Sequence, residues 1–328
     1  MTRLYALTPT WKPVGGVIKI LDYSRHALDL GYEVILVGPP IEPGIPLFEI
    51  ERFQPLAPGG SVDHLEPSRF GAEPDDFVFF SWPTDYETLV HRLTPGTVHE
   101  RVIHIVQNVR HANPSWIGGY ALRLLTRPMA RIMVAEEVLE ACLPWLNRGS
   151  PTEVIPEGHD WAYFSRQRQG GLETPAKVGF TTWKSVVGLE VAAALAHDPR
   201  FEFRSIGETV GWKELRELYH WADIFLACPN QEEGFYLPGL EALAAGALLV
   251  TPDVGGNRAY CRFGENSVLV EYESAPDYVA ALIRLAESPP EPVDAMRQAG
   301  YGVLSEHTLD EEKRRFGEFL DKLHNLPH

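Results

Sequence analysis

Cysteine and basic residues are both scarce in this chain. Its 328 residues include three cysteines, Cys142, Cys228 and Cys261, which are too few and too scattered for a disulfide framework or a CxxC zinc site. Lysine and arginine number 29 against 45 aspartates and glutamates, a formal net charge of -16. Such a field repels phosphate backbones and anionic lipids, which argues against nucleic-acid binding driven by charge.

Long apolar segments are missing as well. No stretch approaches the roughly 18 uninterrupted apolar residues of a membrane-spanning helix, and Lys12 and two prolines stand where a secretory signal needs an apolar run. We therefore expect a cytoplasmic protein. The sequence has no DxD motif, which is consistent with a reaction that needs no metal ion. No GxGxxG follows its first strand, which argues against dinucleotide chemistry.

Length and composition suit a two-domain enzyme. At about 150 residues per domain the chain can build two cores, and 45% hydrophobic with 23% charged residues is ordinary for a globular protein. We expect domains at residues 1–160 and 161–305, and a C-terminal helix at 306–328 that packs back toward the N-terminal domain. Apolar side chains line one side of that helix, namely Phe316, Phe319, Leu320 and Leu323.

Short apolar runs alternate with helical patterns along the chain, which predicts parallel sheets. The stretch 39–74 is rich in proline and glycine, and we expect only a short strand near 46–53 there. The expected fold is therefore α/β, with two Rossmann-like doubly wound domains facing a central cleft. Strands are predicted at residues 4–7, 33–38, 76–82, 101–108, 130–135, 177–182, 201–207, 223–229 and 247–252.

The segment EEGFYLPGLEALAAG, residues 232–246, is the most informative. It follows a predicted strand, and Pro238 suits the first position of a helix that Gly246 would end. Backbone amides of residues 235–239 would then form a positive helix end suited to phosphate or sugar hydroxyls. Glu233 before the helix and Glu241 in its first turn would face the same ligand, although two surface glutamates remain the alternative.

These residues resemble the EX7E segment of retaining GT-B glycosyltransferases of family 4. PVGGV near the start is similar to the family's glycine-rich loop, VIPEGHDWAYF to its domain-junction motif, and WADIFLACP to its ADIFV-PS strand. The resemblance covers most of the chain and is strongest over residues 205–260. It implies nucleotide-sugar-dependent transfer.

The family's site residues carry over by position. The resemblance implies that Glu233 binds donor-sugar hydroxyls, that Glu241 holds the ribose, and that Gly15 and Gly16 let the backbone approach the diphosphate, although an ordinary turn is the alternative for this pair. The implied catalytic residues are Glu233 and Lys184. The implied donor-binding set is Gly15, Gly16, Thr182, Lys184, Glu233, Gly234, Phe235, Tyr236, Leu237 and Glu241.

Several positions depart from the family pattern. After the first strand of the second domain the family usually has an Arg and a Lys, whereas GFTTWKSVVG keeps only Lys184. A solvated lysine on a loop, without a role in binding, is the alternative interpretation of Lys184. Arg204 and Arg258 are candidate substitutes for the missing arginine. Tyr236 replaces a common glycine, which adds bulk beside the donor sugar, and Glu157 replaces a common asparagine.

Acceptor binding is expected at the end of the strand 101–108. Gln107, Asn108 and His111 are the candidates, with His111 placed in a polar turn, whereas His104 within the strand is interpreted as a core residue.

A second pattern consists of three arginines at spacings of four, Arg123, Arg127 and Arg131. They would form a basic helix face, similar to that of membrane-binding members of the family, unless Pro128 ends the helix. Against the overall negative charge we expect weak membrane association or none.

The function indicated is metal-independent, retaining transfer of a hexose, with GDP-mannose as the first donor and UDP-glucose next, to a sugar or oligosaccharide hydroxyl. No cofactor is expected beyond the nucleotide sugar, and a homo-oligomer is left open. Two alternatives remain. One is an epimerase or phosphorylase on the same architecture, and the other is a catalytically silent nucleotide- or sugar-binding protein.

Overall fold

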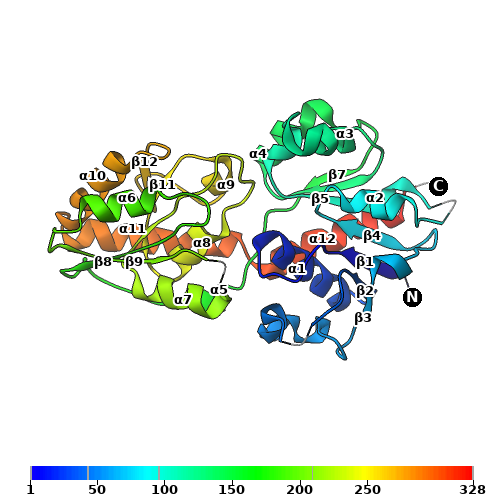
Figure 1. Ribbon diagram of the computed structural model, residues 1–328, viewed down its shortest axis with the longest axis horizontal. Coiled ribbons are helices and arrows are strands. Elements are labelled where there is room, and N and C mark those ends of the chain that lie inside the picture. Colours follow the sequence, from blue (N-terminus) through cyan, green and yellow to red (C-terminus); the bar gives the residue numbers. More distant parts are fainter. Residues whose placement is uncertain (1, 43, 95–96, 209, 327–328) are drawn as a thin grey trace. The chain divides into compact units, whose positions relative to one another are not determined.

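The computed structural model describes residues 2–42, 44–94, 97–208 and 210–326. The chain forms two compact units, the first comprising Met1–Gly158 with Leu309–His328 and the second His159–Thr308 (Figure 1). Each unit is built on a parallel sheet with helices, the Rossmann-like architecture expected from the alternating pattern. The division falls two residues before the boundary placed at 160.

In its described part, the first unit contains a seven-stranded sheet with the order β3-β2-β1-β4-β5-β6-β7. The chain starts in the middle of this sheet, so the strand order reverses between β1 and β4, and parallel sheets bind ligands beside the carboxyl ends of the strands at such a point. Its strands are β1 Arg3–Leu7, β2 Glu33–Val37, β3 Asp63–Leu65, β4 Phe77–Phe80, β5 Val102–Val106, β6 Ala130–Met133 and β7 Thr152–Val154.

The α-helices of this unit include the C-terminal one, which lies beside the first helix of the chain (Figure 1). Its predicted apolar side is buried, because Phe316, Phe319, Leu320 and Leu323 are each at most 2% exposed. The described α-helices are α1 Gly15–Asp29, α2 Asp85–Val90, α3 Tyr120–Leu125, α4 Glu136–Cys142 and α12 Leu309–His324. Short 3-10 turns occupy Pro46–Glu49, Glu51–Leu56, Pro67–Arg69, His99–Arg101, Val109–Ala112, Trp116–Gly119 and Leu143–Trp145.

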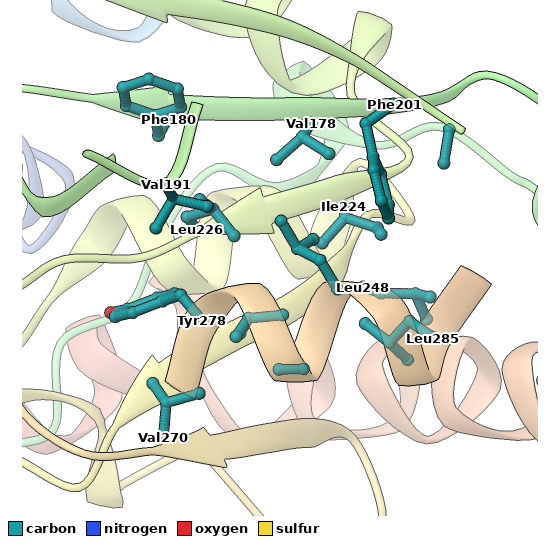
Figure 2. Close-up of a cluster of buried hydrophobic side chains, with 14 of the residues drawn as sticks. Val178, Phe180, Val191, Phe201, Ile224, Leu226, Leu248, Val270, Tyr278 and Leu285 are labelled. Carbon is teal, nitrogen blue, oxygen red and sulfur yellow. The ribbon is translucent and has the colours of Figure 1, made fainter. Parts of the chain in front are cut away.

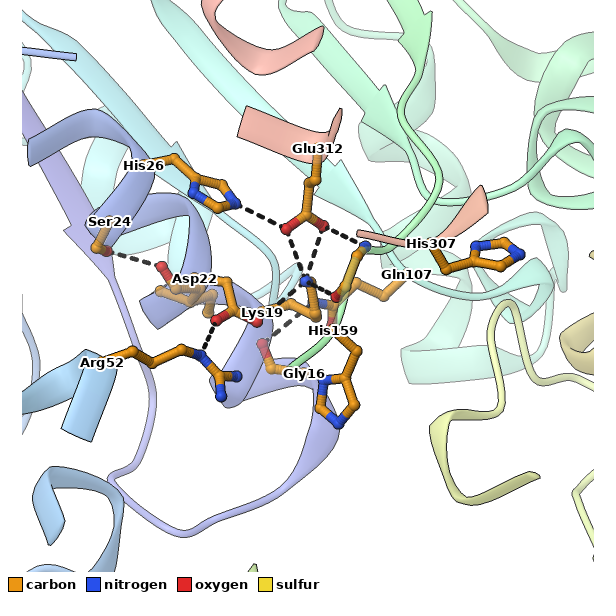
Figure 3. Close-up of polar contacts among 12 residues, drawn as sticks. Gly16, Lys19, Asp22, Ser24, His26, Arg52, Gln107, His159, His307 and Glu312 are labelled. Carbon is orange, nitrogen blue, oxygen red and sulfur yellow. Dashed lines mark hydrogen bonds and ion pairs between the residues drawn. The ribbon is translucent and has the colours of Figure 1, made fainter. Parts of the chain in front are cut away.

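A buried ionic cluster ties α12 to α1 (Figure 3). The Nζ atom of Lys19 lies 3.0 Å from a carboxylate oxygen of Asp22 and 2.7 Å from one of Glu312. The second Glu312 oxygen contacts Nε2 of His26 at 2.9 Å, and Arg52 donates to Asp22 at 2.8 Å. Since a buried charge is tolerated only when it is paired, this cluster fixes the position of the final helix on the first unit.

The strand predicted near 46–53 is wrong. This stretch forms the two 3-10 turns Pro46–Glu49 and Glu51–Leu56, whose apolar side chains Leu47, Phe53 and Leu56 are buried. Proline at 46 and 55 has no amide hydrogen for a strand ladder, which favours the turns. The strand of this region is instead β3 Asp63–Leu65, at the edge of the sheet.

The basic helix face does not form, because the helix ends before Pro128, which is the alternative that the sequence left open. The helix α3 ends at Leu125, and Arg131 lies in β6, fully buried. Its guanidinium donates to the carbonyls of Leu124, Leu125 and Arg127 at 2.6–3.0 Å, so it caps the free carbonyl end of α3. Burial lowers the pKa of Arg131 to about 10, which still leaves it charged at neutral pH.

The second unit has a five-stranded parallel sheet in its described residues, with the order β12-β11-β10-β8-β9. Its strands are β8 Ala176–Thr181, β9 Phe201–Ile206, β10 Ile224–Leu226, β11 Leu248–Pro252 and β12 Ser267–Val270. The described helices are α5 Trp161–Phe164, α6 Val187–Ala194, α7 Trp212–Trp221, α8 Leu237–Ala244, α9 Gly255–Arg258, α10 Ala275–Ala286 and α11 Pro290–Gly302, followed by a 3-10 turn at Val303–Glu306.

The core of this unit fills the space between the sheet and the helices α6 and α10 (Figure 2). Val178, Ile224 and Leu248 come from three adjacent strands, and Tyr278 and Leu282 come from α10. The Tyr278 hydroxyl donates to the carbonyl oxygen of Ala227 at 2.9 Å, just beyond β10. This packing holds the carboxyl end of β10 in place, where the functional loop begins.

In the part of the chain that the structure describes, no helix is long and apolar enough to cross a membrane.

Candidate functional site

The strand order of the second sheet reverses between β8 and β10, which is the position where open α/β sheets bind ligands. Lys184 follows the carboxyl end of β8, and Glu233 lies in the loop after β10. Because both strands are parallel neighbours, their following loops meet at one edge of the sheet. The sequence-predicted pair is thus brought together by topology.

The ammonium group of Lys184 forms an ion pair with a carboxylate oxygen of Glu233. The lysine side chain is 28% exposed and that of the glutamate 9%, so the pair opens to solvent on the lysine side. The same ammonium lies 5.4 Å from the ring centre of Tyr236, within cation–π distance. Lys184 is therefore paired and places a positive charge at this edge, while its part in catalysis stays a prediction.

Helix α8 begins beside this ion pair. It runs Leu237–Ala244 with Pro238 in its first turn, and Gly246 follows with a φ of 74°, as the sequence predicts. No side chain caps its N-terminus and no acidic residue occupies its first turn in the described structure. The positive end of this helix thus carries no negative side chain of its own in its first turn.

Not all of the predicted amides are available. The amide of Tyr236 donates to the carbonyl oxygen of Gly256 at 2.6 Å, and the amide of Gly239 donates to the carbonyl oxygen of Tyr236 at 3.2 Å. The expectation that all amides of residues 235–239 converge on a ligand is therefore wrong. The neighbouring loop at Gly255 and Gly256 uses one of them.

That neighbouring loop supports Glu233 directly. An added Cβ at Gly256 would lie 2.5 Å from the Cβ of Glu233, so only glycine fits there. Asn257 holds the loop, since its side-chain amide donates to Thr251 at 2.9 Å and to the Pro252 carbonyl at 2.8 Å. The signal in the sequence is the pair Gly255 and Gly256 after a buried strand.

Glu241 has a different environment from the one expected. It lies in the second turn of α8, not the first, and is 3% exposed. One carboxylate oxygen is 2.8 Å from Nε2 of His159, and the other accepts a hydrogen bond from the hydroxyl of Tyr219 at 2.8 Å. Protein groups thus contact both oxygens of this buried carboxylate, which leaves at most the remaining lone pairs for a ribose hydroxyl.

His159 and Tyr219 were missed by sequence reasoning. His159 stacks on the ring of Phe164 at 5.3 Å and packs edge-on against Trp212 at 5.0 Å. This aromatic packing orients the imidazole toward Glu241. The sequence signal was His159 itself, two residues after Glu157 in the junction motif.

The remaining donor candidates of the second unit are Phe235, Tyr236, Leu237, Gly234 and Thr182, and their described contacts are with other parts of the protein. Phe235 is 7% exposed and packs against Tyr260 and His307, Leu237 is 6% exposed, and Tyr236 is buried. Gly234 lies between Glu233 and Phe235 in the same loop. The amide of Thr182 donates to the carbonyl of Ile206, so its backbone belongs to the sheet.

The two candidate substitute arginines lie elsewhere in the second unit. Arg204 is exposed on the edge strand β9, at the register of Gly179 and before the carboxyl end of the sheet. Arg258 is an exposed residue paired with Asp253 at 2.7 Å. Neither has a described contact with Lys184 or Glu233. Among the described residues, no group of three or more His, Cys, Asp or Glu side chains is arranged to hold a metal ion.

The glycine-rich loop of the first unit meets one of the predicted acceptor residues. Gln107, just after β5, donates from Nε2 to the carbonyl oxygen of Gly16 at 3.1 Å. An added Cβ at Gly16 would lie 2.5 Å from the Gln107 side-chain oxygen, so any larger residue there would make the end of that side chain shift. Gly15 and Gly16 begin α1, whose N-terminus has no side-chain cap in the described structure. Gln107 thus positions the loop.

The other two acceptor candidates differ from each other. His111 was expected in a polar turn, but it is 1% exposed, between His104 at 5.2 Å and Trp116 at 4.9 Å. Burial lowers its pKa to about 4, so the ring is neutral and inaccessible, and its role as a direct acceptor contact is not supported. Asn108 lies at the carboxyl end of β5, and its Oδ1 has no hydrogen-bond partner among the described residues.

His104 is confirmed as a core residue. It is fully buried and stacks on Phe80 with ring centres 4.7 Å apart and an interplanar angle of 4°. Two tryptophans that the sequence analysis passed over lie nearby, after β4 and β5. Trp82 is 44% exposed and meets Trp116 edge-on at 5.8 Å, which offers an aromatic surface at the carboxyl edge of this sheet.

Asp85 begins α2, three residues after Trp82. Its Oδ2 atom is buried and finds no partner within the described part of the chain. Burial without a compensating cation raises the pKa of this carboxyl to about 7. A carboxyl group that changes charge near neutral pH therefore lies at the edge that carries Trp82 and Asn108.

The substitution Asp85→Asn is expected to stabilise the protein at pH 8 but not at pH 4. Because the folded pKa exceeds that of the unfolded chain, the native state holds more protons between about pH 4 and 7, and stability falls as the pH rises through that window. The loss is on the order of 4 kcal/mol at pH 8, and asparagine avoids it. Denaturant unfolding at several pH values measures this difference, with Glu87→Gln on the exposed side of α2 as the control. An effect of Asp85→Asn that does not vary with pH would contradict it.

The sequence matches to known proteins include a family match that lies within the second unit. Residues 186–288 match the family described as "Glycosyl transferases group 1". The chain is 39% identical over 75 residues to the D-inositol 3-phosphate glycosyltransferase of Thermomonospora curvata, covering 23% of this chain and 17% of that protein. It is 32% identical over 101 residues to the protein of the same name from Rhodococcus erythropolis, covering 30% and 23%. The chain thus matches about a fifth of the length of these curated relatives.

Similarity to solved structures extends over both units. The sucrose-phosphate synthase (tll1590) of Thermosynechococcus elongatus has a TM-score of 0.72 at 13% identity, covering 99% of both chains. Anabaena Alr3699/HepE, solved in complex with UDP and glucose, has a TM-score of 0.73 at 12% identity, covering 98% of this chain and 99% of that one. The chain therefore has the GT-B fold of two Rossmann-like units, and its second unit is similar to the group 1 glycosyl transferases.

Proposed function

We propose that the protein is a retaining glycosyltransferase that moves a hexose from a nucleotide diphosphate sugar to a hydroxyl of a carbohydrate acceptor. The observation that carries this proposal is the ion pair of Lys184 and Glu233 beside the uncapped N-terminus of α8, at the strand-order reversal of the second sheet. A cation and a helix N-terminus suit a diphosphate, and a carboxylate suits sugar hydroxyls. The match of residues 186–288 supports the assignment to this unit.

Donor choice is the finer part of the proposal. The similar Anabaena structure was solved with UDP and glucose, so UDP-glucose is the first donor to test, ahead of the GDP-mannose favoured by the sequence resemblance. Tyr236, with its buried ring beside Lys184, takes the space of a common family glycine and limits the room for the sugar. We place the acceptor at the Trp82 and Asn108 edge of the first unit, since an exposed indole suits the apolar face of a sugar ring.

The proposed reaction needs no covalent enzyme intermediate. The bond between the anomeric carbon and the phosphate oxygen breaks, and its electron pair stays on the diphosphate. The acceptor oxygen bonds to the anomeric carbon on the same face, and its proton passes to the departing phosphate oxygen. Lys184 and the amide end of α8 stabilise the developing charge of the diphosphate, which is the task of a metal ion in other transferases.

Exchange of partners at Glu233 is part of this proposal. Without ligand, Lys184 neutralises Glu233. When a diphosphate approaches, it competes for the ammonium group and frees the carboxylate to accept hydrogen bonds from sugar hydroxyls. Asn230, whose side-chain nitrogen lies 3.5 Å from the same oxygen, remains as a neutral partner.

Glutamine substitutions at the two glutamates separate turnover from nucleotide binding. Glu233→Gln is expected to lower kcat by about tenfold to a hundredfold with UDP affinity within a factor of three, because its oxygen acts on the sugar. Glu241→Gln is expected to weaken UDP binding by about tenfold, because it disturbs the acceptor of both His159 and Tyr219. Calorimetry with UDP and steady-state transfer assays measure the two effects.

The control for this pair is Glu232→Gln, the exposed neighbour of Glu233. Equal UDP affinity in all three variants and wild type would contradict the assigned division. Binding of UDP or GDP without hydrolysis or transfer of any nucleotide sugar would favour the catalytically silent protein instead. EDTA-sensitive transfer would contradict the metal-free mechanism.

A further inference from the structure

A second pocket lies on the opposite edge of the sheet in the second unit. Its volume is about 390 Å³, and residues near the amino ends of the strands line it. Lys177 is the second residue of β8, and Asp223 directly precedes β10. Lys184 and Glu233 follow the carboxyl ends of the same two strands. Since β8 has six residues at about 3.3 Å each, the two edges are roughly 20 Å apart, too far for one small ligand.

Cationic side chains dominate this second pocket. Four of them line it against two carboxylates, namely Arg166, Arg168, Lys177 and Arg297 against Glu173 and Asp223. The whole chain carries a net charge of -16, so the positive charge gathered in this pocket is opposite in sign to the net charge of the protein.

Local contacts hold the arginines in place without neutralising all of them. Arg168 forms an ion pair with Asp223, and both Arg166 and Arg168 donate to the carbonyl oxygen of His220 near the end of α7. Arg297, whose side chain is 3% exposed, donates to the carbonyl oxygen of Gly170 at 2.7 Å. Carbonyl partners fix a guanidinium without compensating its charge, and the described carboxylate partners are Asp223 for Arg168 and Asp294, which lies 3.9 Å from Arg297.

Two observations indicate that this pocket would bind an anion favourably. The Nε atom of Arg168 is buried and has no hydrogen-bond partner among the residues that the structure describes. Burial lowers the pKa of Arg168, and the nearby positive charges of Arg166 and Arg297 lower it further, although Asp223 acts in the opposite direction. An anion among these groups would relieve their mutual repulsion.

We propose that this pocket, lined by Arg166, Arg168, Lys177 and Arg297, binds a small molecule through its phosphate groups, separately from the donor sugar. Guanidinium groups pair with phosphate through two parallel hydrogen bonds, and a lysine adds a point charge. The volume exceeds that of one phosphate group, which leaves room for a diphosphate or for an attached organic group. The ligand would bind at the amino edge while a nucleotide sugar occupies the carboxyl edge.

The test is calorimetric titration of the full chain with inorganic pyrophosphate in the presence of saturating UDP. UDP occupies the proposed donor site, so that pyrophosphate reports on the second pocket. The double variant Arg166→Gln and Lys177→Gln is expected to weaken pyrophosphate binding at least tenfold, and to leave UDP binding within a factor of two. The matched control is Arg284→Gln with Lys213→Gln, two exposed cations of the same unit outside the pocket.

Unchanged pyrophosphate affinity in the pocket variant, or an equal loss in the control, would overturn the proposal. So would the absence of pyrophosphate binding to the wild-type protein. Lys177→Gln alone, expected to weaken binding at least threefold, covers the case in which the double variant does not fold. Failure of UDP to bind the wild type would argue against the proposed transferase function, whereas pyrophosphate binding that depends on Arg166 and Lys177 would still establish the second pocket.

Discussion

Replacing Lys184 with alanine is expected to lower kcat a hundredfold to a thousandfold, on the proposed transferase function. Lys184 is the cation that the structure places at Glu233 and the N-terminus of α8. Loss of one fixed donor that stabilises a developing negative charge raises the barrier by about 3 to 4 kcal/mol. The effect should fall on kcat more than on KM, because the charge of the leaving diphosphate grows toward the transition state.

Steady-state kinetics with UDP-glucose and GDP-mannose measure this loss. Lys213→Ala, an exposed lysine of α7 in the same unit, is the control for removing a positive charge. Lys184→Arg should recover part of the rate, since it keeps a charge at this edge with different geometry. Turnover of Lys184→Ala within a factor of five of wild type would contradict the catalytic role of this residue.

The same substitution affects folding only modestly. The ion pair is partly open, with 28% of the lysine side chain exposed, and Asn230 remains 3.5 Å from the same Glu233 oxygen when the lysine is lost. Partly exposed ion pairs contribute about 0 to 1 kcal/mol. A large loss of activity with a small loss of stability is therefore the signature that separates a catalytic from a structural role.

Local sequence patterns predicted the frame of this site well. The apolar runs of β8 and β10 are buried on both faces and bounded by polar residues, which makes them easy to recognise. The positions of Pro238 and Gly246 in the sequence predict the start and the end of helix α8 to within one residue. Because parallel strands align their carboxyl ends, the meeting of Lys184 with Glu233 follows from topology once the strands are known.

The directions in which individual side chains point could not be predicted from the local sequence patterns. His111 has the polar neighbours Arg110 and Asn113, yet the 3-10 turn Val109–Ala112 rotates its ring under Trp116. Arg131 continues an apparent helical spacing, but Pro128 separates it from α3 and its guanidinium turns back to the helix end. Glu241 finds its partners through tertiary contacts with His159, 82 residues earlier in the chain. Long-range packing decided each of these outcomes.

Truncation of Glu312 is expected to destabilise the first unit by about 3 to 5 kcal/mol. Its side chain is fully buried, with one oxygen accepting from the Gly158 amide at 3.1 Å and the other contacting Lys19 at 2.8 Å and His26 at 2.9 Å (Figure 3). Glu312→Ala leaves the Lys19 ammonium with Asp22 as its remaining carboxylate partner and leaves the Gly158 amide without its acceptor. Removing one member of a buried ionic cluster costs this much because the other charge stays buried.

The matched control is Glu318→Ala, an exposed glutamate on the other side of the same helix, expected to change stability by at most about 0.5 kcal/mol. Glu312→Gln should lie between the two, since it keeps an acceptor for the amide but loses the charge facing Lys19. Because the chain has two units, hydrogen exchange resolved by segment is the better readout than one melting temperature. Amides of α1 and α12 should exchange faster in Glu312→Ala while those of β8 and β10 stay protected. Uniformly faster exchange in both units, or none in α12, would show that this cluster does not hold the C-terminal helix on the first unit.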